Sequence, residues 1–126
     1  MVKVEEKLNI EEVLRQFKNG QMVIVVDDED RENEGDFIIS AEKAEPQDIN
    51  FMMKEGRGLI CIPITQSYSN RLNLGPMVSD NTSIHETNFT VSVDAKKNAT
   101  TGISAKDRWE TIQVILNDNS IYSQLH

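Results

Sequence analysis

Residues 22–41 read MVIVVDDEDRENEGDFIISA, two apolar runs that enclose an acidic one. Met22–Val26 is short, continuous and rich in β-branched residues, which is typical of a strand buried on both faces. Phe37–Ala41 resumes the apolar pattern and predicts a second strand. The segment between them, Asp27–Asp36, is therefore expected to be a loop that the core holds at both ends.

Helical and strand patterns alternate along the rest of the chain. Apolar residues at i, i+3, i+4 and i+7 predict a helix over 10–18, with Asn9 as its N-cap and Gly20 at its end. The further expected elements are a helix over Pro46–Glu55, a buried strand over Leu59–Ile62, a helical turn near Ser67–Leu72, a half-buried strand over Phe89–Val93, and a helix that opens at Ser104 and carries Trp109, Ile112, Ile115 and Leu116. This order predicts a mixed α/β (α+β) fold with a mixed sheet, formed by residues 1–126 as a single domain.

Composition excludes several classes of partner. The net charge is −8, so the chain lacks the basic face that nucleic acid or an anionic membrane requires. No apolar run is long enough to cross a bilayer, and Met1–Lys7 mixes charges where a signal peptide needs an apolar stretch. Cys61 is the single cysteine, which indicates a reducing compartment, so we expect a cytoplasmic protein.

The acidic loop Asp27–Asp36 is the strongest functional signal. Seven of its ten residues are acidic, and such a cluster repels itself unless a cation or hydrogen-bond donors neutralise it. A calcium EF-hand is excluded, because Asn33 falls where that loop needs glycine and strands flank the segment. Carboxylates without clustered histidine or cysteine favour Mg²⁺ or Mn²⁺. A solvated surface turn is the alternative for such a run.

Other polar positions give weaker signals. Thr101-Gly102 precedes the capped helix at Ser104, where backbone N–H groups could hold phosphate, although ordinary turn and capping chemistry explains the same residues. His85 lies in a polar stretch typical of exposed loops. Cys61 is expected first of all to be a small buried strand residue.

Five ordered segments carry a family resemblance over nearly the whole chain from Ile10 to Leu125. They are Asp27–Asp36, Gly56–Cys61, Asn81–Ser83, Phe89–Ala95 and Thr100–Arg108. Together they resemble the 3,4-dihydroxy-2-butanone 4-phosphate synthases of riboflavin biosynthesis. That family converts D-ribulose 5-phosphate into formate and a four-carbon phosphate, and the resemblance implies its fold, Mg²⁺ (or Mn²⁺) at the site and a homodimer.

The resemblance also implies roles for individual residues. Glu32 matches the metal-ligand glutamate and, with Glu34 and Asp36, the catalytic acids of the loop. Arg31, Glu32 and Asp36 match positions that contact the sugar phosphate. Cys61 and Thr90 are implied to line the substrate pocket. These types suit the chemistry, because enolisation needs a carboxylate to move protons, a divalent ion stabilises the enediolate, and an arginine orients an anionic sugar.

The family pattern extends beyond Leu125, into segments with histidines and a late glutamate that this sequence does not contain. His126 is not assigned either histidine's role. A fragment, a truncated paralogue and a protein completed by another chain all fit this pattern, and so does a GTP cyclohydrolase II domain fused downstream, as some family members carry. We therefore expect little turnover by this polypeptide alone. A non-catalytic module that binds a phosphosugar or family subunits is the alternative function.

Overall fold

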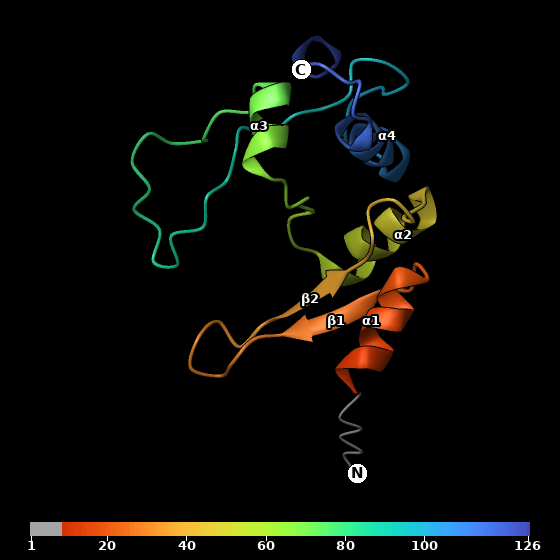
Figure 1. Cartoon of the computed structure of the whole chain (residues 1–126), viewed down its shortest axis with the longest axis vertical. Coiled ribbons are helices and arrows are strands. Elements are labelled where there is room, and N and C mark those ends of the chain that lie inside the picture. The colour runs from red at the N-terminus through yellow and green to blue at the C-terminus, as the bar shows by residue number, and fades with distance from the viewer. Residues whose placement is uncertain (1–8) are drawn as a thin grey trace. The chain divides into compact units, whose positions relative to one another are not determined.

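The computed structural model describes residues 9–126, so the prediction about Met1–Lys7 lies outside the described residues. Its elements are α1 (Ile10–Lys18), β1 (Val23–Val26), β2 (Gly35–Ile38), α2 (Pro46–Phe51), the π-helical turn η1 (Met52–Gly56), α3 (Gln66–Leu72), α4 (Ala105–Leu116) and the 3₁₀ turn η2 (Tyr122–Gln124) (Figure 1). They form two compact units, divided after Ala44. The single-domain organisation stays a prediction.

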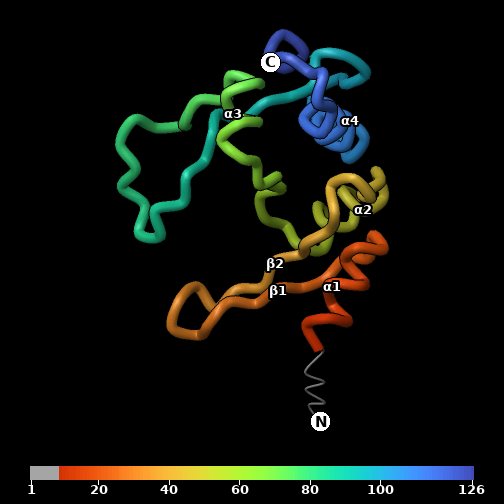
Figure 2. Tube along the Cα trace, in the orientation of Figure 1, coloured from red at the N-terminus to blue at the C-terminus, as the bar shows by residue number. Residues whose placement is uncertain are grey.

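The first unit consists of α1 and an antiparallel hairpin. The side chain of Asn9 accepts a hydrogen bond from the Glu11 backbone N–H at 3.1 Å and caps α1, as predicted. Gly20 ends the helix with a φ of +85°, and its N–H donates to the Phe17 carbonyl. β1 then pairs with β2 in the register Val23↔Ile38 to Val26↔Gly35. Figure 2 shows the acidic loop as the turn that joins these strands.

The prediction that the first strand is buried on both faces is wrong for the described structure. Ile24 and Val26 are each 64% exposed, and Val25 is 48% exposed. Burial on both faces requires covering layers, and the sheet described here has only the two strands β1 and β2. The second strand also begins earlier than predicted, at Gly35, and ends at Ile38.

The second unit holds the hydrophobic core. Leu72, Leu74, Ile115 and Leu125 form its buried centre, and Ile62, Ile64, Tyr68, Val93 and Val114 pack against them. α2 packs against α4, with Ile49 buried. α4 begins at the predicted N-cap, where the Ser104 hydroxyl accepts from the Asp107 N–H at 3.0 Å. Of the apolar stripe predicted on α4, only Ile115 is fully buried.

Two predicted strands of this unit are not found. Leu59–Ile62 has no regular structure, and Leu59 is 85% exposed. The segment 89–93 makes only an isolated antiparallel bridge, between Thr90 and Pro76. The continuous apolar run 59–62 and the alternation in 89–93 both suit a strand, but a ladder also needs a neighbouring strand. In residues 9–126 the strands β1 and β2 pair with each other, and segment 89–93 has only the bridge to Pro76.

The predicted helices are found where the predicted strands of this unit are not, because helices depend on signals in the nearby sequence. The turn predicted near Ser67–Leu72 is α3, and the helix predicted over Pro46–Glu55 divides into α2 and η1. Over the described part of the chain, no helix is both long and apolar enough to cross a membrane.

Candidate functional site

Asp27 organises the acidic loop. It follows β1 directly, and its carboxylate accepts the backbone N–H of Glu34 at 2.9 Å and that of Glu32 at 3.1 Å. The Asp28 carbonyl accepts from the N–H groups of Arg31 and Asn33, and Asn33 has a φ of +49°. The loop is therefore a folded turn, in which one carboxylate fixes the backbone at two of the predicted catalytic positions.

Charge in the loop is partly compensated from within. The Arg31 guanidinium lies 3.6 Å from the Asp27 carboxylate and 3.9 Å from that of Glu32. The hydrogen bond from the Glu34 N–H lowers the pKa of Asp27 below its ordinary value of 3.8; the Glu32 N–H and the charge of Arg31 act in the same direction, and partial burial opposes them. Asp27 is thus ionised throughout the physiological range.

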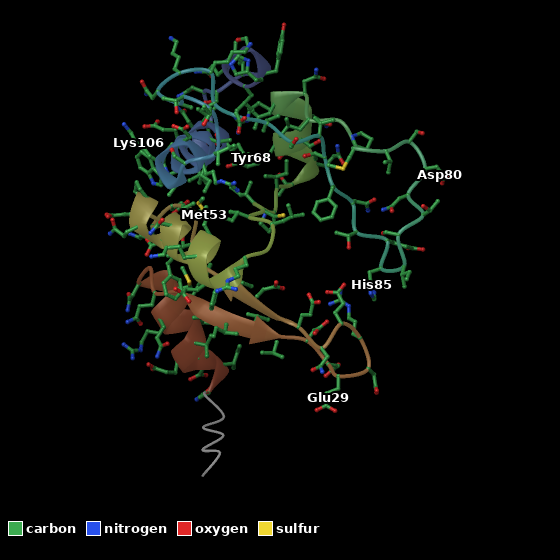
Figure 3. The ribbon with its side chains drawn as sticks, turned by 180° about the vertical axis from the view of Figure 1, so that it is seen from behind. Glu29, Met53, Tyr68, Asp80, His85 and Lys106 are labelled. Carbon is green, nitrogen blue, oxygen red and sulfur yellow. The ribbon has the colours of Figure 1, made fainter. Side chains whose placement is uncertain are left out.

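The predicted loop residues lie on one hairpin but do not form a closed ligand set. Arg31, Glu32, Glu34 and Asp36 are all exposed, and Asp36 stands opposite Val25 on β2. Glu29 extends outward from the loop tip (Figure 3). Within residues 9–126, no three histidine, cysteine, aspartate or glutamate side chains converge to hold a metal ion. The loop therefore presents hard oxygen donors without gathering three of them at one point in the described structure.

The other two predicted site residues, Cys61 and Thr90, belong to the second unit. Cys61 is exposed and outside any strand, so the expectation of a buried strand residue is wrong. Thr90 is half-buried, and its hydroxyl donates to the Val91 carbonyl at 3.0 Å. Their predicted contact with substrate stays a prediction.

The turn at Thr101-Gly102 is engaged by the protein's own carboxylate. Asp107, 2% exposed, accepts from the Thr100 hydroxyl at 2.8 Å and from the Gly102 N–H at 3.1 Å. The Thr100 hydroxyl is the main cause that lowers the pKa of Asp107, with burial opposing it. The Asp107 carboxylate already accepts the hydrogen bonds that this turn offers. The structure therefore favours ordinary turn and capping chemistry over phosphate binding.

The role of Asp27 was not predicted from the sequence. The seven acids of the loop look alike in composition, whereas in the structure the first of them accepts hydrogen bonds from two backbone N–H groups. The available signal was position, because an aspartate that directly follows a strand often accepts from backbone groups a few residues further on.

Acid should loosen the loop through Asp27. A lowered pKa means that the carboxylate stabilises the folded loop above pH 3.8, and that this contribution is lost as the pH falls from 3.8 through the lowered value. We expect the amide proton shifts of Glu32 and Glu34 to titrate together in that window. The measurement is a ¹H–¹⁵N NMR titration.

Two variants control that titration. Asp27→Asn should abolish the shared transition, whereas Asp28→Asn should preserve it, since the Asp28 side chain is exposed and the loop uses its carbonyl. A transition that survives in Asp27→Asn would contradict the assignment.

The chain has a mixed α/β fold with a carboxylate-rich loop between two strands. Proteins that bind hard cations such as Mg²⁺ present oxygen ligands in this way. Comparison with known proteins makes this specific. A family model described as 3,4-dihydroxy-2-butanone 4-phosphate synthase matches residues 11–126. The chain belongs to the 3,4-dihydroxy-2-butanone 4-phosphate synthase family.

Curated relatives agree with this assignment. The chain is 55% identical over 123 residues to the riboflavin biosynthesis protein RibBA of Porphyromonas gingivalis. That alignment covers 96% of this chain and 30% of the relative. It is 59% identical over 111 residues to RibBA of Bacillus cereus, covering 88% of this chain and 28% of that protein. The chain therefore spans less than a third of these relatives' length.

Solved structures show the same fold. A 3,4-dihydroxy-2-butanone 4-phosphate synthase in complex with two magnesium ions matches with a TM-score of 0.88 at 41% identity, over 93% of this chain and 55% of that one. RibBX, a two-domain synthase from A. baumannii, matches with a TM-score of 0.83 at 42% identity, over 94% of this chain and 34% of that one. The mixed α/β fold predicted from the sequence is confirmed over this part of the family structure.

Proposed function

We propose that this chain supplies the acidic-loop portion of a Mg²⁺-dependent lyase that converts D-ribulose 5-phosphate into formate and 3,4-dihydroxy-2-butanone 4-phosphate. The observation that carries the proposal is the hairpin loop in a member of this family, in which Asp27 holds the backbone of Glu32 and Glu34. A homodimer and a cytoplasmic location are inferred with it.

The loop residues divide the work by chemical type. Glu32 offers a hard oxygen ligand to the metal. Glu34 and Asp36 can accept and return protons beside the sugar carbonyl. Arg31 already lies near two carboxylates, and its planar fork has further N–H donors with which to orient an anionic sugar.

The carboxylates of the loop are the type of ligand that magnesium prefers, but too few of them converge in residues 9–126 to hold the ion tightly. Carboxylate oxygens are what Mg²⁺ selects, and Mg²⁺ commonly takes only one or two of them from protein. When bound, the ion would polarise the substrate's carbonyl and hydroxyl oxygens. Because no three candidate ligands converge in residues 9–126, we expect weak metal binding by this chain alone.

Replacing the metal-ligand candidate should weaken metal binding. We expect Glu32→Gln to lower Mn²⁺ affinity by at least about tenfold, since even changes behind a ligand commonly cost that much. Mn²⁺ titration followed by electron paramagnetic resonance measures this directly. Glu29→Gln is the matched control, because it removes the same charge at the outward-pointing loop tip (Figure 3). Equal losses in both variants would show that the loop attracts cations only by its overall charge.

Formate release from D-ribulose 5-phosphate with Mg²⁺ tests the lyase itself. We expect slow release by this chain and none by Glu32→Gln. Turnover equal to that of a full-length family member would contradict the expectation of weak activity. Metal binding without any release, even when the rest of a synthase is supplied, would favour the non-catalytic module that binds a phosphosugar or family subunits.

A further inference from the structure

The Arg31 guanidinium is shared between two carboxylates of the acidic loop. Its Nη1 lies 3.6 Å from an oxygen of Asp27, and its Nη2 lies 3.9 Å from an oxygen of Glu32. Asp27 fixes the backbone of the loop, whereas Glu32 is the proposed metal ligand. A single cation therefore connects a structural carboxylate with a carboxylate proposed for the chemistry.

The contact of Arg31 with Asp27 is the more durable of the two. The Asp27 side chain is 20% exposed and the Glu32 side chain 35% exposed, so water weakens the attraction to Glu32 more strongly. Asp27 is also held in place, because its carboxylate accepts two backbone N–H groups at 2.9 and 3.1 Å. A competing cation therefore replaces the contact with Glu32 first.

A divalent cation and Arg31 compete for the Glu32 carboxylate. A carboxylate that coordinates a metal ion keeps little charge with which to attract a guanidinium 3.9 Å away. The charge of the ion also repels Arg31 directly. Asp27 holds the guanidinium in the loop meanwhile, so Arg31 loses one partner without leaving the site.

We infer that Arg31 is an exchangeable counterion, which Glu32 releases when it takes up a metal ion and which Asp27 retains for an anionic sugar. The inference rests on the proposed function, since it takes Glu32 as the metal ligand. The N–H donors released from Glu32 become available to a phosphate or another anionic oxygen. Metal binding thereby raises the affinity for the sugar phosphate, and by linkage the sugar phosphate raises the affinity for metal.

The first test measures Mn²⁺ binding without substrate. We expect Arg31→Gln to tighten Mn²⁺ binding about two- to fivefold, because it removes a competitor that an exposed ion pair holds on Glu32. Electron paramagnetic resonance measures the affinity, and an unchanged amide NMR spectrum outside the loop shows that the variant folds. Arg15→Gln is the matched control, since Arg15 is an exposed arginine of the same unit that pairs with Glu12, and it should leave the Mn²⁺ affinity unchanged.

A double-mutant cycle tests whether Asp27 retains the arginine. Asp27→Asn should weaken Mn²⁺ binding more than Asp28→Asn does, because it leaves Glu32 as the carboxylate that holds Arg31. Once Arg31 is already glutamine, the loss of Asp27 should cost less. The double variant Asp27→Asn/Arg31→Gln should therefore bind Mn²⁺ about twofold or more tighter than the two single effects combined. Additive effects would overturn the role given to Asp27.

The exchange itself is visible at the guanidinium. Diamagnetic Mg²⁺ should shift the ¹⁵Nε resonance of Arg31 in the native chain and leave it in place in Glu32→Gln, while that of Arg15 stays constant in both. Mg²⁺ should also tighten the binding of D-ribulose 5-phosphate by a larger factor in the native chain than in Arg31→Gln, by about twofold or more. Isothermal titration calorimetry measures the second effect, and the comparison removes the direct contact between metal and sugar.

The outcomes separate this inference from the proposed function. Mn²⁺ affinity that is unchanged or weaker in Arg31→Gln, or an Arg31 signal that Mg²⁺ does not move, would overturn the exchange even when Glu32→Gln lowers Mn²⁺ affinity as proposed. If Arg31→Gln tightens Mn²⁺ binding and no formate is released even with the rest of a synthase supplied, the lyase activity fails and the exchange stands. If Glu32→Gln leaves Mn²⁺ affinity unchanged, both fail together.

Discussion

Replacing Gly102 with alanine should destabilise the second unit by about 2–4 kcal/mol, from the combined costs of left-handed strain and overpacking. Gly102 has a φ of +81°, which a residue with a Cβ adopts only under strain. A Cβ built there would clash with the carboxylate of Asp94. Its N–H also donates to Asp107, so the backbone cannot turn away without losing that bond. Urea unfolding measures the loss.

Gly58→Ala is the matched control for this prediction. Gly58 has no atom within 4 Å of the added Cβ and no left-handed φ, so the free energy of unfolding should change by less than about 0.5 kcal/mol. A double-mutant cycle with Asp94→Ala then divides the effect, because removing that carboxylate relieves the clash and leaves the backbone strain. Equal stability of the Gly102→Ala and Gly58→Ala variants would show that the turn can rearrange freely.

Local signals explain why the helices could be predicted from sequence. Asn9 and Ser104 each accept a backbone N–H within three residues, so their caps are determined by the nearby chain. Strands depend on neighbours that may be distant in sequence. The segments 59–62 and 89–93 have the apolar patterns of strands, but within residues 9–126 the strands β1 and β2 pair with each other and segment 89–93 makes only an isolated bridge.

In the acidic loop, too, only part of the structure could be predicted from the sequence. A run of carboxylates predicts a hard cation from composition alone, and a similar synthase has been solved in complex with two magnesium ions. The selection of Asp27 as the acceptor for two backbone N–H groups depends on how the loop turns, which its composition does not determine. The burial expected for Cys61 failed because it presupposed a strand covered on both faces.

Arg71 should be the most important single cation for the stability of the second unit. It reaches from α3 to the end of α4, where Nη1 donates to the carbonyls of Asn117 and Ser120, both at 2.8 Å. Nη2 donates to the Ile115 carbonyl at 3.1 Å, and the guanidinium lies 4.7 Å from the centre of the Tyr68 ring. The Ile115 carbonyl belongs to the last turn of α4, whose carbonyls lack an intrahelical partner, and the Asn117 and Ser120 carbonyls lie directly beyond it. Arg71 therefore replaces water at a partly buried helix terminus.

Arg71→Met should lower the free energy of unfolding by about 3 kcal/mol, because three charge-assisted hydrogen bonds to carbonyls next to the core are lost. Arg57→Met is the control, since Arg57 is exposed and makes a single 3.3 Å bond to the Lys54 carbonyl, and it should change stability by less than about 0.5 kcal/mol. Arg71→Lys should recover only part of the loss, because an ammonium group lacks the planar fork that serves three carbonyls at once. Urea unfolding with hydrogen exchange at residues 117–120 distinguishes these cases: protection there should fall in Arg71→Met and persist in Arg57→Met. Unchanged protection in both variants would mean that the core residue Ile115, and not the arginine, holds the end of α4 in place.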